Sequence, residues 1–381
     1  MSLTTLAIHR AGFAWNQSTD PRLVGLRHLI DSRLRRPVCT ISHAGPEGPS
    51  VGYTGVFHGT RQILDLLEGL RDRNGIPTAG TNELLVRRAD LWSGWVPPAD
   101  LVAVGCSPAQ ARRLSGRSAL VLPYRLHLVV DLRDGWLDAV TKGERQWIRT
   151  RRRERDWRLS VATDDASFEH FFDRMHLPTM RVRHGRRTRS ESRERARHCL
   201  FRSGVLAFAV VDGERVAGAL CHRSRHGATI TLRLVGVLDG AREHYDAGAL
   251  KILYHLLFGW AQASGIRHVD LGGMEAWISS GTFRWKRRFS PRMVLAPNHL
   301  GRLRVWWHAR RDTPAVRDFL VANPVFEVVG DTGLRAVYFH DDERPARRDF
   351  GFSCVNVQQV RTVHLDEFLV REALHADAHA D

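Results

Sequence analysis

Two titratable side chains late in the sequence are of the types that proton transfer and charge stabilisation require. Asp270 follows His268 and Val269 on a short apolar segment. There it could orient an incoming amine, or act as a general base if burial raises its pKa. Lys286 is a lysine among arginines, in a cluster of five cations over residues 284–292. The plainer alternatives are a carboxylate paired with an arginine and a solvated surface lysine.

A stripe of cations forms a third candidate. Arg145, Arg149 and Arg152 recur at spacings of four and three, which places them on one face of a helix. The chain of 381 residues has 57 Lys+Arg against 41 Asp+Glu, a net charge of +16. A field of this sign attracts phosphate-bearing partners. The stripe could therefore bind phosphates of a donor or an acceptor, and a solvated helix face is the alternative.

Several other kinds of site lack support in the sequence. The five cysteines are scattered without a CxxC pair, which argues against a disulfide framework or a zinc knuckle. No Ser/His/Asp or Cys/His arrangement and no metal-ligand spacing is recognisable, so we expect no metal and no covalent enzyme intermediate. No apolar run approaches the ~20 residues of a membrane span, and the N-terminal MSLTTLAIHR lacks the features of a secretion signal. We expect a cytoplasmic protein without an integral membrane segment, and its oligomeric state stays open.

Hydrophobic periodicity predicts the elements that must position these side chains. Apolar residues at helical spacing predict helices over residues 61–73, 135–155, 164–177 and 247–264. Alternating or β-branched runs predict strands over residues 101–104, 118–130, 228–237 and 267–272. Residues 43–60 are rich in Gly and Pro and are expected to form loops and turns. A tight Asp212-Gly213 turn between two apolar runs predicts a hairpin of strands 205–211 and 215–221.

The strand–strand–strand–helix–strand order of residues 205–272 resembles the core of the GNAT acyltransferase superfamily. In that superfamily the strands before and after the long helix splay apart, and the acyl donor lies in the gap. Unpaired backbone N–H groups can hold a carbonyl there, and the helix N-terminus favours phosphate. The resemblance implies an α+β fold, a GNAT-type mixed, mostly antiparallel sheet flanked by helices. Two tandem GNAT-like modules are a further alternative.

Two more stretches are similar to the Fem-type N-acyltransferases. Leu128-Val-Val-Asp-Leu132, followed by a basic helix, is similar to the opening of their acyltransferase module. His268-Val-Asp-Leu-Gly-Gly273, followed by Gly281-Thr-Phe-Arg-Trp-Lys-Arg-Arg-Phe289, is similar to their closing signature. The likeness spans about residues 120–290. It implies an acyltransferase module over residues 121–300, a partial or degenerate GNAT-like acceptor-side module over 1–120, and a C-terminal extension over 301–381.

The resemblance also implies roles for individual side chains. Lys286, at the lysine of the closing signature, would stabilise the oxyanion of a tetrahedral intermediate. Tyr245, Gly248 and Lys251, at the mouth of the long helix, are expected to bind the donor together with Arg233. Gly248 would let the helix begin close to the donor, and Lys251 would contact a phosphate. Arg287 is expected to join the arginine stripe in binding phosphate or acceptor.

One departure from the superfamily pattern bears on the donor. In the stretch that usually holds a pyrophosphate, here Arg242-Glu-His-Tyr245-Asp-Ala247, Tyr245 replaces the first glycine. A bulky residue obstructs the close backbone approach that glycine permits. Fem-type enzymes share this departure, so the pattern also fits a donor other than coenzyme A.

Three functions follow as alternatives. The first is an enzyme that transfers an aminoacyl group from aminoacyl-tRNA to an amine, favoured by the net charge and the altered cradle. The second is an N-acyltransferase that uses acyl-CoA or a carrier-protein thioester on a small amine, peptide or sugar. The third is a nucleic-acid-binding protein that kept the fold without activity. No tightly bound cofactor is expected, because the acyl donor is a co-substrate.

Overall fold

The computed structural model describes residues 3–33, 36–45, 47–114, 116, 118–185, 190–224 and 226–369. The chain divides into two compact units, each drawn from separate stretches of the sequence. Unit 1 comprises residues 1–18, 127–272 and 286–293, and unit 2 comprises residues 19–126, 273–285 and 294–381. These units do not coincide with the three segments expected from the sequence, residues 1–120, 121–300 and 301–381. The assignment of one module to each of those segments stays a prediction.

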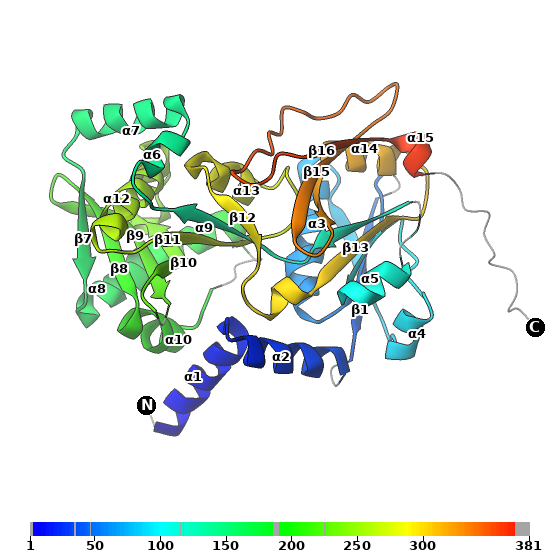
Figure 1. The fold of residues 1–381 in the computed structure, drawn as a ribbon, viewed down its shortest axis with the longest axis horizontal. Helices are drawn as coiled ribbons and strands as arrows, with labels where there is room; N and C mark the ends of the chain where they lie inside the picture. Colours follow the sequence, from blue (N-terminus) through cyan, green and yellow to red (C-terminus); the bar gives the residue numbers. More distant parts are fainter. Residues whose placement is uncertain are drawn as a thin grey trace, which may run out of the picture. The chain divides into compact units, whose positions relative to one another are not determined.

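Unit 1 is built on a mixed sheet of seven strands, counted over the described residues, in the order β12-β6-β11-β10-β9-β8-β7 (Figure 1). Strands β7 to β10 pair antiparallel, and β10 pairs with β11 in parallel. The strands are β6 (Leu126–Asp131), β7 (Arg158–Ala162), β8 (Val205–Val211), β9 (Glu214–Arg223), β10 (Thr229–Val237), β11 (His268–Met274) and β12 (Arg292–Leu295). The sheet confirms the α+β prediction of a mixed, mostly antiparallel sheet flanked by helices.

The hairpin and the helix–strand series of unit 1 form as predicted. Asp212 and Gly213 both have positive φ, 52° and 82°, as a two-residue hairpin turn of type I′ requires. The helices of the unit are α1 (Leu3–Gln17), α6 (Trp136–Ala139), α7 (Lys142–Glu154), α8 (Asp165–His170), α9 (Leu177–His184), α10 (Arg193–Arg195), α11 (Arg242–Asp246) and α12 (Ala249–Ala263). A π-helical segment, Phe171–His176, joins α8 to α9. The single helix expected over residues 135–155 is divided into α6 and α7.

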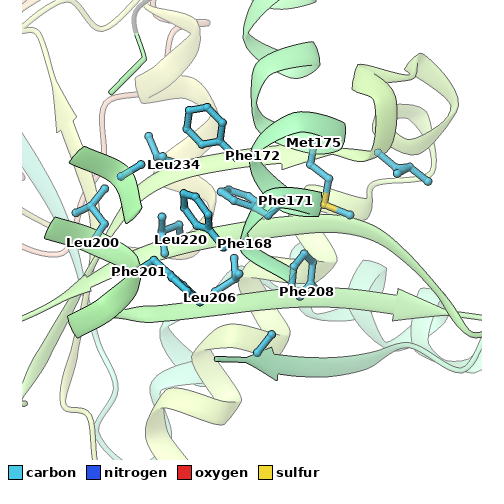
Figure 2. Close-up of a cluster of buried hydrophobic side chains, with 13 residues drawn as sticks. Phe168, Phe171, Phe172, Met175, Leu200, Phe201, Leu206, Phe208, Leu220 and Leu234 are labelled. Carbon is cyan, nitrogen blue, oxygen red and sulfur yellow. The ribbon is translucent and has the colours of Figure 1, made fainter. Parts of the chain in front are cut away.

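The core of unit 1 lies between these helices and one face of the sheet. Figure 2 shows Phe168, Phe171, Phe172 and Met175 against strand residues that include Phe208. Each of these side chains is buried, and burying a side chain of this size contributes about 1.5–3 kcal/mol. Helix α12 also packs on β8, β9 and β10. Alternation along the strands places it on the other face, so α12 and the aromatic core enclose the sheet.

Unit 2 contains a six-stranded sheet and a three-stranded sheet within the described residues. The first has the order β3-β1-β2-β4-β13-β5, and the second has the order β14-β15-β16. Its strands are β1 (Val38–Ala44), β2 (Val51–Gly55), β3 (Thr78–Leu84), β4 (Leu101–Cys106), β5 (Ala119–Pro123), β13 (Arg304–Ala309), β14 (Val325–Val329), β15 (Gly333–His340) and β16 (Val360–His364). Its helices are α2 (Pro21–Arg33), α3 (Asp65–Arg73), α4 (Arg88–Trp92), α5 (Pro108–Leu114), α13 (Gly281–Lys286, whose last residue belongs to unit 1), α14 (Pro314–Ala322) and α15 (Leu365–Phe368).

Two predictions for unit 2 were wrong. Residues 43–60, expected as loop, contain β2, which is buried between β1 and β4. The single strand expected over residues 118–130 is two strands, β5 and β6, separated at Tyr124 and Arg125. The π-helical turn Thr60–Leu64 and α3 confirm the helix predicted over residues 61–73.

Candidate active site

The parallel strands β10 and β11 separate shortly after they meet. Their ladder joins only Thr229 with His268, Ile230 with Val269 and Thr231 with Asp270. Beyond that point β10 continues to Val237 paired only with β9 on its other side, and β11 continues to Met274. The backbone groups of β10 and β11 that face this divergence are therefore not joined to each other. Asp270 is at the last paired position, where the divergence begins.

The carboxylate of Asp270 is buried and fully engaged. One oxygen, Oδ2, lies 2.7 Å from His127 Nδ1, and the other, Oδ1, accepts a 2.8 Å hydrogen bond from the backbone N–H of Gly272. Burial alone would raise the pKa of Asp270, but the hydrogen bond and charge of His127, the Gly272 N–H and the Lys286 ammonium outweigh it and hold the pKa below its ordinary value. The raised pKa that a general base at Asp270 would need is not found. The arrangement instead makes Asp270 an anchor for its neighbours.

The most informative of these neighbours is His127, which sequence reasoning missed. It lies on β6, which is adjacent to β11 in the sheet, and its side chain is 12% exposed. Because the Asp270 carboxylate only accepts hydrogen bonds, Nδ1 of His127 must carry the proton. In the neutral imidazole this leaves a lone pair on Nε2. A histidine oriented by a buried carboxylate in this way is the usual arrangement of a general base.

Lys286 lies beside Asp270 and Gly272, and its role in stabilising an oxyanion stays a prediction. Its ammonium donates a 3.1 Å hydrogen bond to the carbonyl of Gly272, two residues beyond Asp270 on β11. Part of its electrostatic effect falls on Asp270, whose pKa it lowers. Gly272 has a φ of +80°, and a Cβ there would lie 3.1 Å from the Leu232 carbonyl of β10. Lys286 therefore holds an ammonium group where β10 and β11 begin to separate.

The residues at the start of α12 form a second group. Gly248 caps the helix with a φ of +80°, and a Cβ there would lie only 2.5 Å from the indole of Trp147. Lys251 pairs with Glu144 at 2.9 Å, and its Nζ lies 3.6 Å from the centroid of the Trp147 ring. Burial would raise the pKa of Glu144, but hydrogen bonds and charge from His255 and Lys251 outweigh it and lower that pKa. The predicted phosphate contact of Lys251 thus competes with an ion pair, whose side chains are 12% and 8% exposed.

The remaining predicted residues lie in three settings. Tyr245 is in α11, where its hydroxyl is buried without a hydrogen-bond partner among the described residues and Arg183 lies over its ring. Arg233 donates hydrogen bonds to Gln17 of α1 and to Glu191, at 2.8 and 3.0 Å, so its charge is already engaged. Arg287 directly follows Lys286, and its Nε is buried with no partner in the ranges that the structure describes.

Arg145, Arg149 and Arg152 line one cavity, which confirms that they share a face of α7. The cavity has a volume of about 610 Å³, and α6 and α12 supply much of its opposite wall. Searched over the described ranges, the protein has no group of three or more His, Cys, Asp or Glu side chains that could hold a metal ion. No helix in those ranges is both long enough and apolar enough to cross a bilayer.

Unit 2 contains a parallel pair that contrasts with β10 and β11. Strands β2 and β4 pair without interruption from Val51 with Leu101 to Gly55 with Gly105. A Cβ on Gly55, whose φ is +130°, would lie 2.3 Å from the Gly105 carbonyl oxygen. The two strands are therefore still paired at Gly55 and Gly105, where both are about to end, whereas β10 and β11 separate well before β10 ends.

Comparisons with known proteins identify a family model that matches part of the chain. Residues 142–287 match the family model of the acetyltransferase (GNAT) domain, and this range contains β10, α12, β11 and Lys286. A search of curated proteins finds no matching sequence.

Similar solved structures include L-PGS from Bacillus licheniformis, at 13% identity and a TM-score of 0.35, over 81% of this chain and 97% of that one. FemX is 11% identical with a TM-score of 0.36, over 72% and 85%. A GCN5-related N-acetyltransferase from Sphaerobacter thermophilus is 15% identical with a TM-score of 0.32, over 79% and 89%. Because these scores are low, the comparison rests on the family match: residues 142–287 are similar to the acetyltransferase (GNAT) domain.

Proposed function

We propose that this protein forms amide bonds, by direct attack of an amine on the activated carbonyl of an acyl donor held between β10 and β11. The observation that carries the proposal is the divergence of these strands after Thr231 and Asp270, with the Lys286 ammonium at its start. Separated strands leave backbone N–H groups available to a bound carbonyl. Donors held in place in this way stabilise the negative charge that develops on the carbonyl oxygen.

In the reaction that this geometry supports, a neutral amine forms the new N–C bond and the carbonyl oxygen becomes an oxyanion. Lys286 and backbone N–H groups stabilise that oxyanion. Nε2 of His127 takes the proton that the attacking nitrogen loses, and Asp270 stabilises the resulting imidazolium through Nδ1. When the tetrahedral intermediate collapses, the C–O or C–S bond of the donor breaks, and the leaving group regains a proton from His127. Every proton and electron pair is accounted for without a covalent enzyme intermediate.

The favoured donor is aminoacyl-tRNA. The net charge of +16 suits a polyanionic substrate. At the start of α12, where a helix N-terminus would favour a pyrophosphate, Trp147 packs against Gly248 and Lys251 is neutralised by Glu144. These contacts weigh against a coenzyme A grip at that helix end. An acyl-CoA or carrier-protein thioester remains the alternative donor, with a small-molecule or peptide amine as acceptor in either case.

The donor is tested with the purified full-length protein. Labelled aminoacyl-tRNA and labelled acetyl-CoA are each incubated with a panel of amines, and formation of the amide product is measured at 50 and 200 mM salt. We expect transfer from aminoacyl-tRNA with an affinity that falls steeply with salt, because several phosphate contacts release counterions. Transfer from acetyl-CoA alone would select the alternative donor.

Lys286→Met is the variant that tests the site. Removing one donor to an oxyanion costs about 10²–10³ in kcat. Lys142→Met is the matched control, because Lys142 is an exposed lysine at the first position of α7. Equal rates for wild type and Lys286→Met in a folded protein would remove the proposed site. Tight RNA binding with no transfer from either donor would instead support the non-catalytic alternative.

A further inference from the structure

The arginine stripe of α7 takes no part in the proposed acyl transfer between β10 and β11, but it lines a cavity of its own. Arg145, Ile148, Arg149 and Arg152 form one wall of the 610 Å³ cavity. Volumes of roughly 300–1,000 Å³ are usual for small-molecule sites. All of the lining residues belong to unit 1, so the cavity is a property of that unit alone.

The opposite wall is apolar and aromatic. Trp136, Leu256 and Trp260 line it, together with Gly259, whose missing side chain leaves open space on the surface of α12. A planar ring could lie flat against such a surface, because aromatic side chains stack on any flat π-system. His255 also lines the cavity, and its buried Nδ1 has no hydrogen-bond partner among the described residues, so an aliphatic chain would leave it unsatisfied.

Two of the three arginines of the cavity are not neutralised from within the described part of the protein, and the third is paired with Asp138, which also lines the cavity. In the described ranges the guanidinium groups of Arg149 and Arg152 have no hydrogen-bond or ion-pair partner. Many arginines nearby do have one, such as Arg151 with Glu154 and Arg155 with Asp212. Arg145 is paired at 3.1 Å only with Asp138, whose side chain is 84% exposed. Two unpaired guanidinium groups beside an apolar surface suit a ligand that combines an anion with a flat apolar part.

We infer that this cavity binds a nucleotide, with the base against the Trp136, Leu256 and Trp260 wall and the phosphate against Arg149 and Arg152. The chemistry is shared by a free nucleotide and by a nucleotide within an RNA strand. The inference does not depend on the proposed acyl transfer, because none of its residues belongs to the His127, Asp270 and Lys286 group.

Binding is measured by equilibrium dialysis of the full-length protein against three labelled probes. ADP represents a free nucleotide, a hexamer of adenylate represents RNA, and dodecyl phosphate represents an aliphatic anion. We expect both nucleotide probes to bind and dodecyl phosphate to bind at least about tenfold more weakly. The nucleotide probe that binds more tightly shows whether the ligand is a free nucleotide or a nucleotide within an RNA strand. Preferential binding of dodecyl phosphate, or no binding of ADP and the hexamer, would overturn the inference.

Two variants locate the binding. Gly259→Phe fills the cavity from α12, where a new Cβ meets nothing within 4 Å, and is expected to weaken both nucleotide probes at least about tenfold. Arg152→Gln removes one charged contact and is expected to weaken them by about tenfold. Arg153→Gln is the matched control, since Arg153 is exposed on the same helix and does not line the cavity. Equal losses for Arg152→Gln and Arg153→Gln would mean general attraction to a basic surface, and would contradict a nucleotide site here.

Discussion

Replacing Asp270 with asparagine tests the buried anchor of the site without knowledge of the substrate. Asparagine keeps the shape of the side chain but offers only one accepting oxygen. Either the Nδ1–H of His127 or the backbone N–H of Gly272 would then face an amide N–H. A hydrogen bond to a charged group is worth about 1.5–3 kcal/mol, so we expect the free energy of unfolding at pH 7 to fall by about that amount.

The pH dependence follows from the direction of the pKa shift. In the folded protein the pKa of Asp270 is below its ordinary value, so folding favours the carboxylate form. The stabilisation is complete above the ordinary carboxyl pKa of about 3.9, and it is lost as the pH falls through the lower, folded value. The asparagine variant has no such group. The stability difference between wild type and variant should therefore be largest at pH 5–7 and shrink at more acid pH.

Urea unfolding at a series of pH values measures this difference. Asp156→Asn is the control, because its side chain is 66% exposed in a surface ion pair, and such pairs contribute about 0–1 kcal/mol. Wild type and Asp270→Asn with equal stability at pH 7 would refute the account of the buried carboxylate. If the difference in free energy of unfolding between wild type and Asp270→Asn stayed constant at acid pH, the lowered pKa of Asp270 would be refuted.

The remaining predictions concern the base and the start of α12. His127→Gln keeps a side-chain N–H for Asp270 but has no titratable nitrogen, so single-turnover transfer from the active donor should slow by about 10²–10⁴. An unchanged rate would exclude His127 as the base. Gly248→Ala should lower the free energy of unfolding by about 1–3 kcal/mol, measured by thermal melting, because its φ is positive and its Cβ would contact Trp147. Gly259→Ala, in the same helix with open space around it, should cause no loss, and equal effects of the two changes would contradict the steric argument.

The elements that local patterns determine were predicted well. The hairpin of β8 and β9 follows from Asp212-Gly213, and α12 follows from apolar spacing that ends at Gly265. Strand β2 was not predicted, because Gly52 and Gly55 are residues typical of loops. In the folded protein, buried pairing with β1 and β4 outweighs the low strand propensity of these glycines. Pairing between strands that are distant in the sequence cannot be inferred from the residues next to one strand.

The candidate site was predicted in part for the same reason. Asp270 and Lys286 were found through a short motif within one stretch of chain. His127 is 143 residues away from Asp270, and only the order of β6 and β11 in the sheet brings them together. The alternation of apolar and polar residues around His127 predicts a strand, but it does not predict that β11 is the neighbour of that strand in the sheet. The ion pair that engages Lys251 is similarly non-local, since Glu144 lies on α7 and Lys251 on α12.

The first helix of the chain has a consequence for biosynthesis. Helix α1 belongs to unit 1, where Phe13 contacts His222 on β9 and Gln17 accepts from Arg233 on β10. Roughly 200 residues separate α1 from those strands, and a ribosome adding 5–20 residues per second needs about 10–40 s to produce them. During that interval the nascent helix has no strand to dock on. Helix α1 can therefore reach its final place only once β9 and β10 have been synthesised, although it is itself made long before them.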